Sequence, residues 1–200
     1  MFIAIEGLDG AGTTTQLSLL AARLRERGRG VTQTAEPSTG PIGVLIRQAL
    51  RRRVVTQAGD RVAPDALALL FASDRLDHVV DVVEPALERG DIVLSDRYVH
   101  SSLAYQGGEC DMDWVVEINR NARTADLVIF VDVPAEDAVK RIGNRGAAVE
   151  LFEQLETLKG VRARFSDAID RRPERVLYVD GLGSVDEVAQ RLWSALEAHL

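Results

Sequence analysis

The sequence predicts a three-layer α/β fold, in which a five-stranded parallel sheet is flanked by helices on both faces. Short apolar runs alternate along the chain with longer segments of helical spacing. Continuous apolar runs are typical of strands buried on both faces of a parallel sheet, and their alternation with helices indicates α/β layers. The runs are Phe2 to Ile5, Val31 to Ala35, Ile92 to Leu94, Leu127 to Val133 and Val176 to Val179.

Helices are predicted between these strands from apolar spacing and from start and stop signals. The first has one apolar face and ends at glycines: Leu17, Leu20, Ala21 and Leu24, then Gly28 and Gly30. The last opens with a capping-box pattern over Ser184 to Glu187. The others span Pro64 to Arg89, Asp111 to Arg123, Ala135 to Ile142 and Glu150 to Arg171. Ligands of such sheets bind beyond the carboxyl ends of the strands, so we expect the site there.

Length and composition narrow the class of protein. The 200 residues fit one domain spanning 1–200. No apolar run approaches the roughly 18 residues that a membrane span needs, and the N-terminus lacks a signal-peptide pattern, so we expect a cytoplasmic protein with no membrane partner. The single cysteine, Cys110, excludes an internal disulfide framework. The net charge of −7 argues against a nucleic-acid partner.

A glycine-rich segment, EGLDGAGTTT, lies between the first strand and the first helix. Its glycines allow a tight turn whose backbone N–H groups point inward, and the helix dipole adds positive potential, so phosphate can bind without a side chain. Thr14 takes the Ser/Thr position of the P-loop motif, where a hydroxyl binds Mg²⁺. The alternative is a glycine turn that only opens a helix. The predicted phosphate-binding residues are Gly7, Gly10, Ala11, Gly12, Thr13, Thr14 and Thr15.

The chain resembles the thymidylate kinase family, a family of P-loop nucleoside monophosphate kinases. Four segments carry the resemblance, in the expected order over nearly the whole chain: Glu6 to Gly12, Glu36-Pro37, Leu70 to Arg75, and Asp96 to Gly107. The resemblance implies a three-layer P-loop NTPase fold with a short lid. It also implies transfer of a phosphoryl group from ATP to dTMP with Mg²⁺, giving dTDP and ADP, in a homodimer.

For the donor nucleotide, the resemblance implies that Thr14 contacts Mg²⁺ and that Asp96 lies near the ion. It implies a lid over about 141–153, in which Arg145 brings charge to the transferring group. Arg141 would stack on adenine or contact the donor phosphates. Closing such a lid would exclude water from the reaction.

For the acceptor nucleotide, the resemblance implies that Asp9 lies near its sugar and phosphate and that Arg97 clamps the phosphate. With Arg145, these residues form the implied catalytic set. Phe71 would stack on thymine, Arg75 would bond the base edge, and Tyr105 would pack under the deoxyribose. The other implied acceptor residues are Glu36, Pro37, Ser101, Ser102 and Gln106.

Each of these residues also has a structural interpretation when taken alone. Phe71 on an apolar helix face is compatible with core packing. Arg75 is placed to pair with Asp74 or Asp77, and Arg97 is placed to pair with the carboxylate that precedes it. Their joint occurrence at the family's spacing favours a site.

Two residues depart from the family pattern. Thr13 stands at the lysine position of the P-loop, and no lysine precedes residue 140. Ala35 stands where many members carry arginine. Three hypotheses follow: a thymidylate kinase whose lid arginines compensate, a kinase for another nucleotide or deoxynucleoside, and a non-catalytic nucleotide-binding paralogue.

Overall fold

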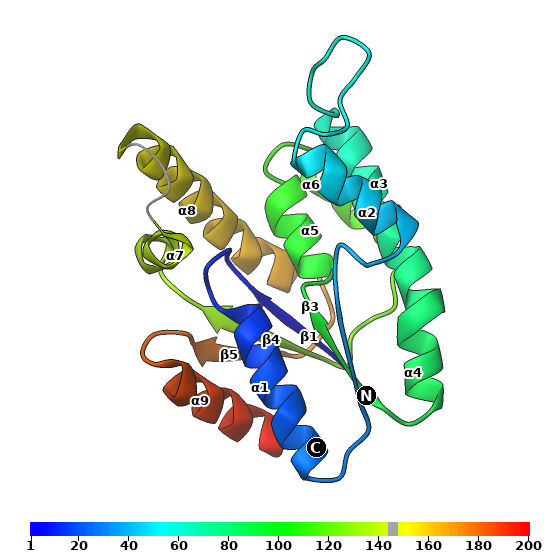
Figure 1. The fold of residues 1–200 in the computed structure, drawn as a ribbon, viewed down its shortest axis with the longest axis vertical. Coiled ribbons are helices and arrows are strands. Elements are labelled where there is room, and N and C mark those ends of the chain that lie inside the picture. The colour runs from blue at the N-terminus through cyan, green and yellow to red at the C-terminus, as the bar shows by residue number, and fades with distance from the viewer. Residues whose placement is uncertain (144–147) are drawn as a thin grey trace.

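The computed structural model describes residues 1–143 and 148–200, with a parallel five-stranded sheet at its centre (Figure 1). The strand order is β2-β3-β1-β4-β5, and every neighbouring pair is parallel. The predicted fold class and all five predicted strands are therefore confirmed. The strands are β1 (Phe2–Gly7), β2 (Val31–Ala35), β3 (Ile92–Asp96), β4 (Leu127–Asp132) and β5 (Val176–Asp180).

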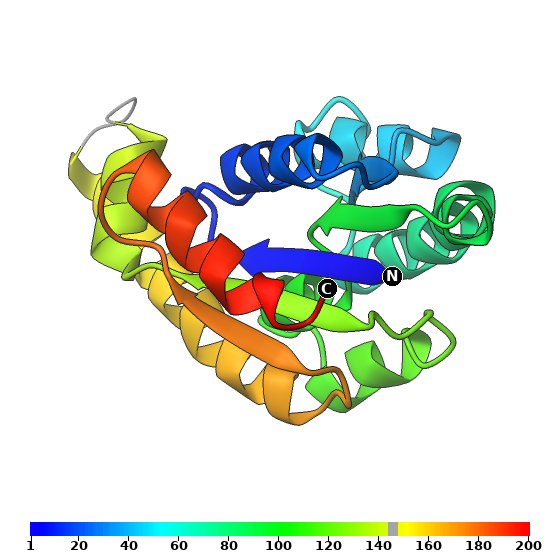
Figure 2. The same cartoon turned by 90° about the horizontal axis from the view of Figure 1, so that it is seen from below.

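Helices cover both faces of the sheet. Helices α1 and α9 pack against each other on one face, and α5 packs against α8 on the other (Figure 2). The helices are α1 (Thr13–Glu26), α2 (Pro41–Leu50), α3 (Pro64–His78), α4 (Glu84–Glu88), α5 (Val99–Gln106), α6 (Met112–Ile118), α7 (Ala135–Ile142), α8 (Ala148–Asp170) and α9 (Val185–Glu197). None of the helices in the described part of the chain is long and apolar enough to cross a membrane.

The side chains of β1 contribute to two apolar cores, because successive side chains of a strand point to opposite faces of the sheet. Ile3 and Ile5 join the core that includes the buried residues of α1 and α9. Phe2 and Ala4 join a second core, which includes residues of α5 and of the α3–α4 region. The first strand is fully buried and is the rigid support for the loop that follows it.

The predicted helices differ from the structure in one divided helix, one boundary and two omissions. The helix predicted over Pro64 to Arg89 forms as α3 and α4, joined by a π-helical segment over Val79–Val83. The helix predicted over Asp111 to Arg123 was too long, since α6 ends at Ile118. Asn119 leaves the helix there and turns its buried side chain toward α3.

Helices α2 and α5 were not predicted. Helix α2 begins at Pro41, which suits a first helical position, and contains Gly43, which lies against the Ser38 backbone. Helix α5 follows β3 directly and contains polar residues that look like a loop in the sequence. Both helices lie near the carboxyl edge of the sheet and shape the cavities described next (Figure 1).

Candidate functional site

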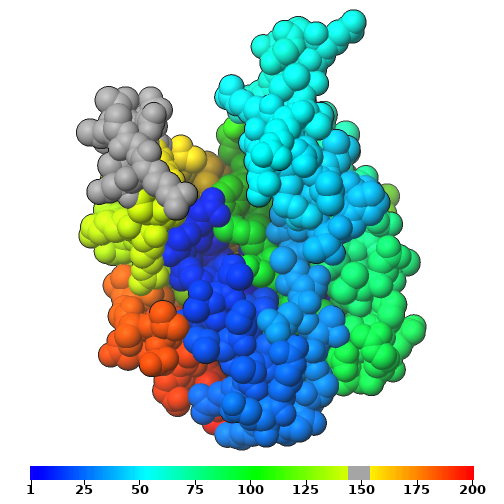
Figure 3. Space-filling view, viewed as in Figure 1, coloured from blue at the N-terminus to red at the C-terminus, as the bar shows by residue number. Residues whose placement is uncertain are grey.

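Two cavities meet at the carboxyl edge of the sheet, and both are lined by Asp9 and Arg97. Figure 3 shows the hollow they share, between α2 and α3 in cyan and α7 in yellow-green. The first, called here the base cavity, has a volume of about 340 Å³. The second, called the phosphate cavity, has a volume of about 430 Å³. A larger hollow of about 460 Å³ between α8 and β5 contains none of the predicted site residues.

The base cavity brings together every residue that the sequence resemblance implied for the acceptor. These residues come from four separate segments of the chain, so their meeting is not a consequence of local spacing. The lining residues are Asp9, Glu36, Pro37, Leu50, Phe71, Arg75, Arg97, Tyr98, Ser101, Ser102, Tyr105 and Gln106.

The glycine-rich loop has the backbone conformation that anion binding needs. Gly10 and Gly12 have φ angles of 85° and 88°, a region that other residues rarely adopt. A Cβ on Gly10 would also collide with the Ala138 carbonyl oxygen of α7. Gly12 is the N-cap of α1, so the amides of the first turn face the phosphate cavity, where the helix dipole favours an anion.

A pair of oxygen ligands lies at one side of the phosphate cavity. The Thr14 hydroxyl donates a hydrogen bond to the Asp96 carboxylate, which stands at the end of β3. The second Asp96 oxygen, Oδ1, is buried and has no hydrogen-bond partner among the described residues. Carboxylate and hydroxyl oxygens suit a hard cation such as Mg²⁺, so these residues fit the predicted metal contact.

Arg97 lies between the two cavities and has a backbone φ of 72°. Its Nη2 is 2.6 Å from Asp9 Oδ1, and its Nη1 donates to Ser101 Oγ at 3.0 Å and to the Gly7 carbonyl at 3.3 Å. The ion pair is therefore with Asp9 on the glycine-rich loop, in contrast to the structural interpretation that paired Arg97 with Asp96.

Tyr105 contacts both members of the Asp9–Arg97 ion pair. Its hydroxyl accepts a hydrogen bond of 3.0 Å from the backbone N–H of Asp9. Its ring faces the Arg97 guanidinium, with 5.1 Å between the ring centroid and Cζ. Burial raises the pKa of the Tyr105 hydroxyl, with a further contribution from Asp9, so the phenol stays neutral.

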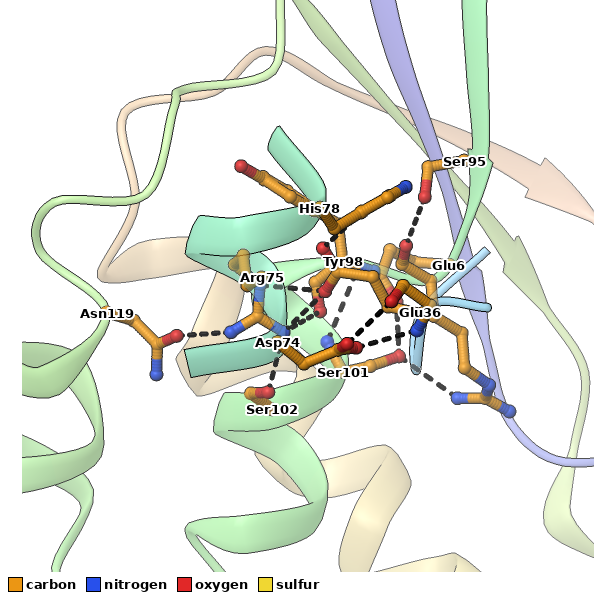
Figure 4. Close-up of polar contacts among 12 residues, drawn as sticks. Glu6, Glu36, Asp74, Arg75, His78, Ser95, Tyr98, Ser101, Ser102 and Asn119 are labelled. Atoms are coloured by element: carbon orange, nitrogen blue, oxygen red, sulfur yellow. Dashed lines mark hydrogen bonds and ion pairs between the residues drawn. The ribbon is translucent and has the colours of Figure 1, made fainter. Parts of the chain in front are cut away.

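Arg75 is almost fully buried, with 1% of its surface exposed. Its Nε and Nη2 contact Glu36 Oε2 at 2.8 Å, Nη2 donates to Ser102 Oγ at 2.8 Å, and Nη1 bonds Asn119 (Figure 4). The partner is thus Glu36 rather than Asp74 or Asp77. These charge-assisted hydrogen bonds fix the orientation of the guanidinium, which forms a polar part of the lining of the base cavity.

Other buried polar residues extend this network. His78 Nδ1 is 3.1 Å from Glu36 Oε1, and His78 Nε2 is 2.6 Å from Thr34 Oγ1. Asp74 accepts two hydrogen bonds of 2.6 Å from the backbone N–H and the hydroxyl of Ser38. The β2–α2 connection that carries Glu36 is therefore fixed on α3 by two carboxylates (Figure 4).

Glu6 is a buried carboxylate to which the sequence interpretation assigned no role. It stands near the end of β1 and is completely shielded from solvent. Burial raises its pKa to about 7, against the opposing effects of Ser101 and Arg97. The sequence signals for it are its place at the start of the glycine-rich motif and its position as an acidic residue at the end of an apolar strand.

The described residues include two cations that line the phosphate cavity, Arg97 and Arg141. Arg141 lies on α7, with Nη1 3.4 Å from the Ala11 carbonyl and Nη2 2.8 Å from the Gly181 carbonyl. Thr13 is buried at the start of α1. Arg145, the other predicted lid cation, lies outside the described residues.

Comparison with known proteins agrees with this geometry. The family model of thymidylate kinase matches residues 5–192. A thymidylate kinase of Thermomicrobium roseum is 42% identical over 202 residues, covering 98% of this chain and 93% of that protein. A probable thymidylate kinase of Thermococcus onnurineus is 40% identical over 207 residues, covering 100% of this chain and 98% of that protein. With this match across the whole sheet and both cavities, the chain belongs to the thymidylate kinase family.

Proposed function

We propose that this protein transfers the γ-phosphoryl group of ATP to dTMP, giving dTDP and ADP. The observation that carries the proposal is the junction of the two cavities at Asp9 and Arg97. One cavity has the backbone of a phosphate site, and the other has an aromatic and polar lining that suits a nucleoside. Phosphoryl transfer depends on positioning and charge neutralisation rather than on a covalent nucleophile, and a guanidinium at the junction supplies both.

The base cavity supports a pyrimidine deoxynucleotide as the acceptor. Phe71 provides a face on which a base can stack, a contact that is worth about 1–3 kcal/mol per base in single-strand binding proteins. Arg75 and Ser102 provide the polar edge, and Tyr105 takes the position under the sugar. Gln106 adds a buried Oε1 with no hydrogen-bond partner in the described part of the chain, which is free to accept from a ligand or a water molecule.

The phosphate cavity supports ATP with Mg²⁺. The loop amides bind the donor phosphates, and Thr14 and Asp96 hold the ion. When bound, Mg²⁺ neutralises phosphate charge and orients the phosphoryl group. Because Thr13 replaces the P-loop lysine, Arg141 supplies charge from α7. The lid, proposed over about 141–153 within one domain spanning 1–200, adds Arg145.

The decisive assay measures ADP formation from ATP and Mg²⁺ with dTMP, dUMP, AMP or no acceptor. We expect turnover with dTMP to exceed turnover with AMP by at least tenfold, because the lining by Phe71, Arg75 and Tyr105 favours a pyrimidine deoxynucleotide. Comparable rates with AMP would favour a kinase for another nucleotide. Binding of ATP without turnover on any acceptor would favour the non-catalytic paralogue, and Thr13→Lys would then test whether the missing lysine is the cause.

We further propose that the protein is cytoplasmic and forms a homodimer through α3 and the π-helical segment after it. Three large apolar side chains on this face are exposed: Leu69, Leu76 and Val80, at 48%, 41% and 68%. An exposed apolar patch on a globular protein commonly marks a contact with another chain.

A further inference from the structure

Glu6 connects β1 to the turn that carries Arg97. Its Oε1 accepts hydrogen bonds from the backbone N–H groups of Tyr98, at 2.9 Å, and Ser101, at 3.2 Å. Its Oε2 accepts from the Ser101 hydroxyl (Figure 4). A buried carboxylate is costly unless it is hydrogen-bonded, and every one of these partners lies in the segment that begins with Arg97. The carboxylate therefore acts on this segment specifically.

The backbone of Arg97 needs such support. Its left-handed conformation is unfavourable for a residue with a side chain. The Arg97 N–H donates to the Ile5 carbonyl at 2.9 Å, and its carbonyl accepts from Ser95 Oγ at 2.8 Å. Glu6 holds the next N–H along the chain, that of Tyr98. The strained residue is thus fixed on both sides, in a conformation that directs its guanidinium toward Asp9.

Ser101 extends the effect of Glu6 to the Arg97 side chain. A hydroxyl has one proton to donate and two lone pairs that accept. Because Glu6 takes the Ser101 proton, the lone pairs of Ser101 Oγ remain for Arg97 Nη1, 3.0 Å away. An amide in place of the carboxylate would direct an N–H group at this oxygen. That N–H group would compete with Arg97 for the lone pairs of Ser101 Oγ, and the hydroxyl would then accept from residue 6 instead of donating to it.

We propose that Glu6 is a positioning residue for Arg97, acting through the Tyr98 backbone and the Ser101 hydroxyl. This inference rests on the proposed function and adds a residue to its site. Glu6 lines neither cavity, so its effect on the reaction passes through Arg97.

The test is a double-mutant cycle between Glu6→Gln and Arg97→Ala, measured as kcat/KM for dTMP at pH 8. We expect Glu6→Gln alone to lower kcat/KM at least tenfold and to cause no further loss in the Arg97→Ala background, because the group that it positions is absent there. An unchanged kcat/KM in Glu6→Gln, or an undiminished loss in the Arg97→Ala background, would overturn the proposal.

Glu174→Gln is the matched control, because Glu174 is an equally buried acid, paired with Arg172 at 2.6 Å outside both cavities. We expect it to lower the Tm and leave kcat/KM for dTMP unchanged. If Glu6→Gln fails to fold, Ser101→Ala replaces it in the same cycle with Arg97→Ala, since it removes the connecting hydroxyl and keeps the carboxylate.

A readout without substrates separates this proposal from the proposed function. Nitrogen-15 relaxation of Arg97 Nε reports the order of the side chain, and we expect the order parameter to fall in Glu6→Gln but not in Glu174→Gln. An equally ordered Arg97 in Glu6→Gln would contradict the proposal even if the wild type lacked turnover. Wild-type turnover with dTMP tests the proposed function by itself.

Discussion

The Arg75 guanidinium is a buried charge, paired with the Glu36 carboxylate and hydrogen-bonded to Ser102. Removing one member of a buried ion pair leaves the other uncompensated, at a cost of about 3–5 kcal/mol. We expect Arg75→Met to lower the free energy of unfolding by an amount of this order, measured by urea denaturation, and to raise KM for dTMP.

The double variant Arg75→Met with Glu36→Gln tests the cause of that loss. It also removes the Glu36 carboxylate that Arg75→Met leaves unpaired, so we expect it to recover part of the stability that the single Arg75 variant loses. A double variant with the summed losses of the two single variants would contradict the buried pair as the source.

Glu6 gives the stability a predictable pH dependence. Its pKa in the folded protein is about 7, against 4.5 for the unconstrained group. The folded state therefore keeps a proton that the unfolded chain releases. The contribution of Glu6 is full below about pH 4.5 and is lost as the pH rises through 7, a change of about 3 kcal/mol.

We expect the Glu6→Gln variant to lack this decline. The measurement is the free energy of unfolding of both proteins at pH 5 and at pH 8, from urea titrations. The difference between variant and wild type should move in favour of the variant at pH 8. A difference that does not change with pH would contradict the raised pKa of Glu6.

At the scale of elements, the phosphate loop depends on contact with α7. Gly10 has both a positive φ and a neighbour, the Ala138 carbonyl, that leaves no room for a Cβ. Gly28, at the end of the first helix, has a φ of 75° and open space around it. Substitution at Gly28 therefore measures the conformational cost of a side chain alone, and substitution at Gly10 measures that cost together with a steric clash.

We expect Gly28→Ala to destabilise the protein by about 1 kcal/mol, the conformational cost alone. Gly10→Ala should cost more and should weaken ATP binding at least tenfold, because the loop must move away from α7. Thermal unfolding and calorimetric titration with ATP measure the two effects. Equal stabilities with unchanged ATP affinity in both variants would contradict the packing of the loop.

The sequence predicts the elements whose pattern is simple. The strands are apolar runs, and Ser184 with Glu187 forms the predicted capping box at the start of α9. Helix α5 has no such pattern, because its Ser101 and Ser102 are polar yet buried, bonded to Glu6 and Arg75. Local periodicity cannot reveal a polar face that is buried by tertiary hydrogen bonds.

The candidate site shows the same division. Phe71 and Tyr105 are visible from family motifs, and the structure places them in one cavity. Glu6, His78 and Asn119 were missed because their roles come from partners that are distant in the sequence, such as Asn119 for Arg75 across 44 positions. Such pairings depend on the topology of the sheet and its helices.

At the scale of the whole molecule, the proposed dimer gives a simple prediction. Sedimentation velocity at micromolar concentration should show a species of about twice the 21.9 kDa chain mass. Val80→Glu places a charge on the exposed apolar face of the π-helical segment, so we expect the variant to sediment as a monomer. Because Val80 is exposed, we expect the fold of the single chain to remain intact. A wild-type monomer under these conditions would contradict the proposed contact.

The central claim for the whole molecule is that the two cavities work as one site for direct phosphoryl transfer. The most direct measurement follows the label from ATP labelled at the γ-phosphate, with Mg²⁺ and dTMP. We predict that the label appears in the β-phosphate of dTDP and that its transfer requires Arg97. Label released as inorganic phosphate, or retained in ATP while both nucleotides bind, would contradict the claim.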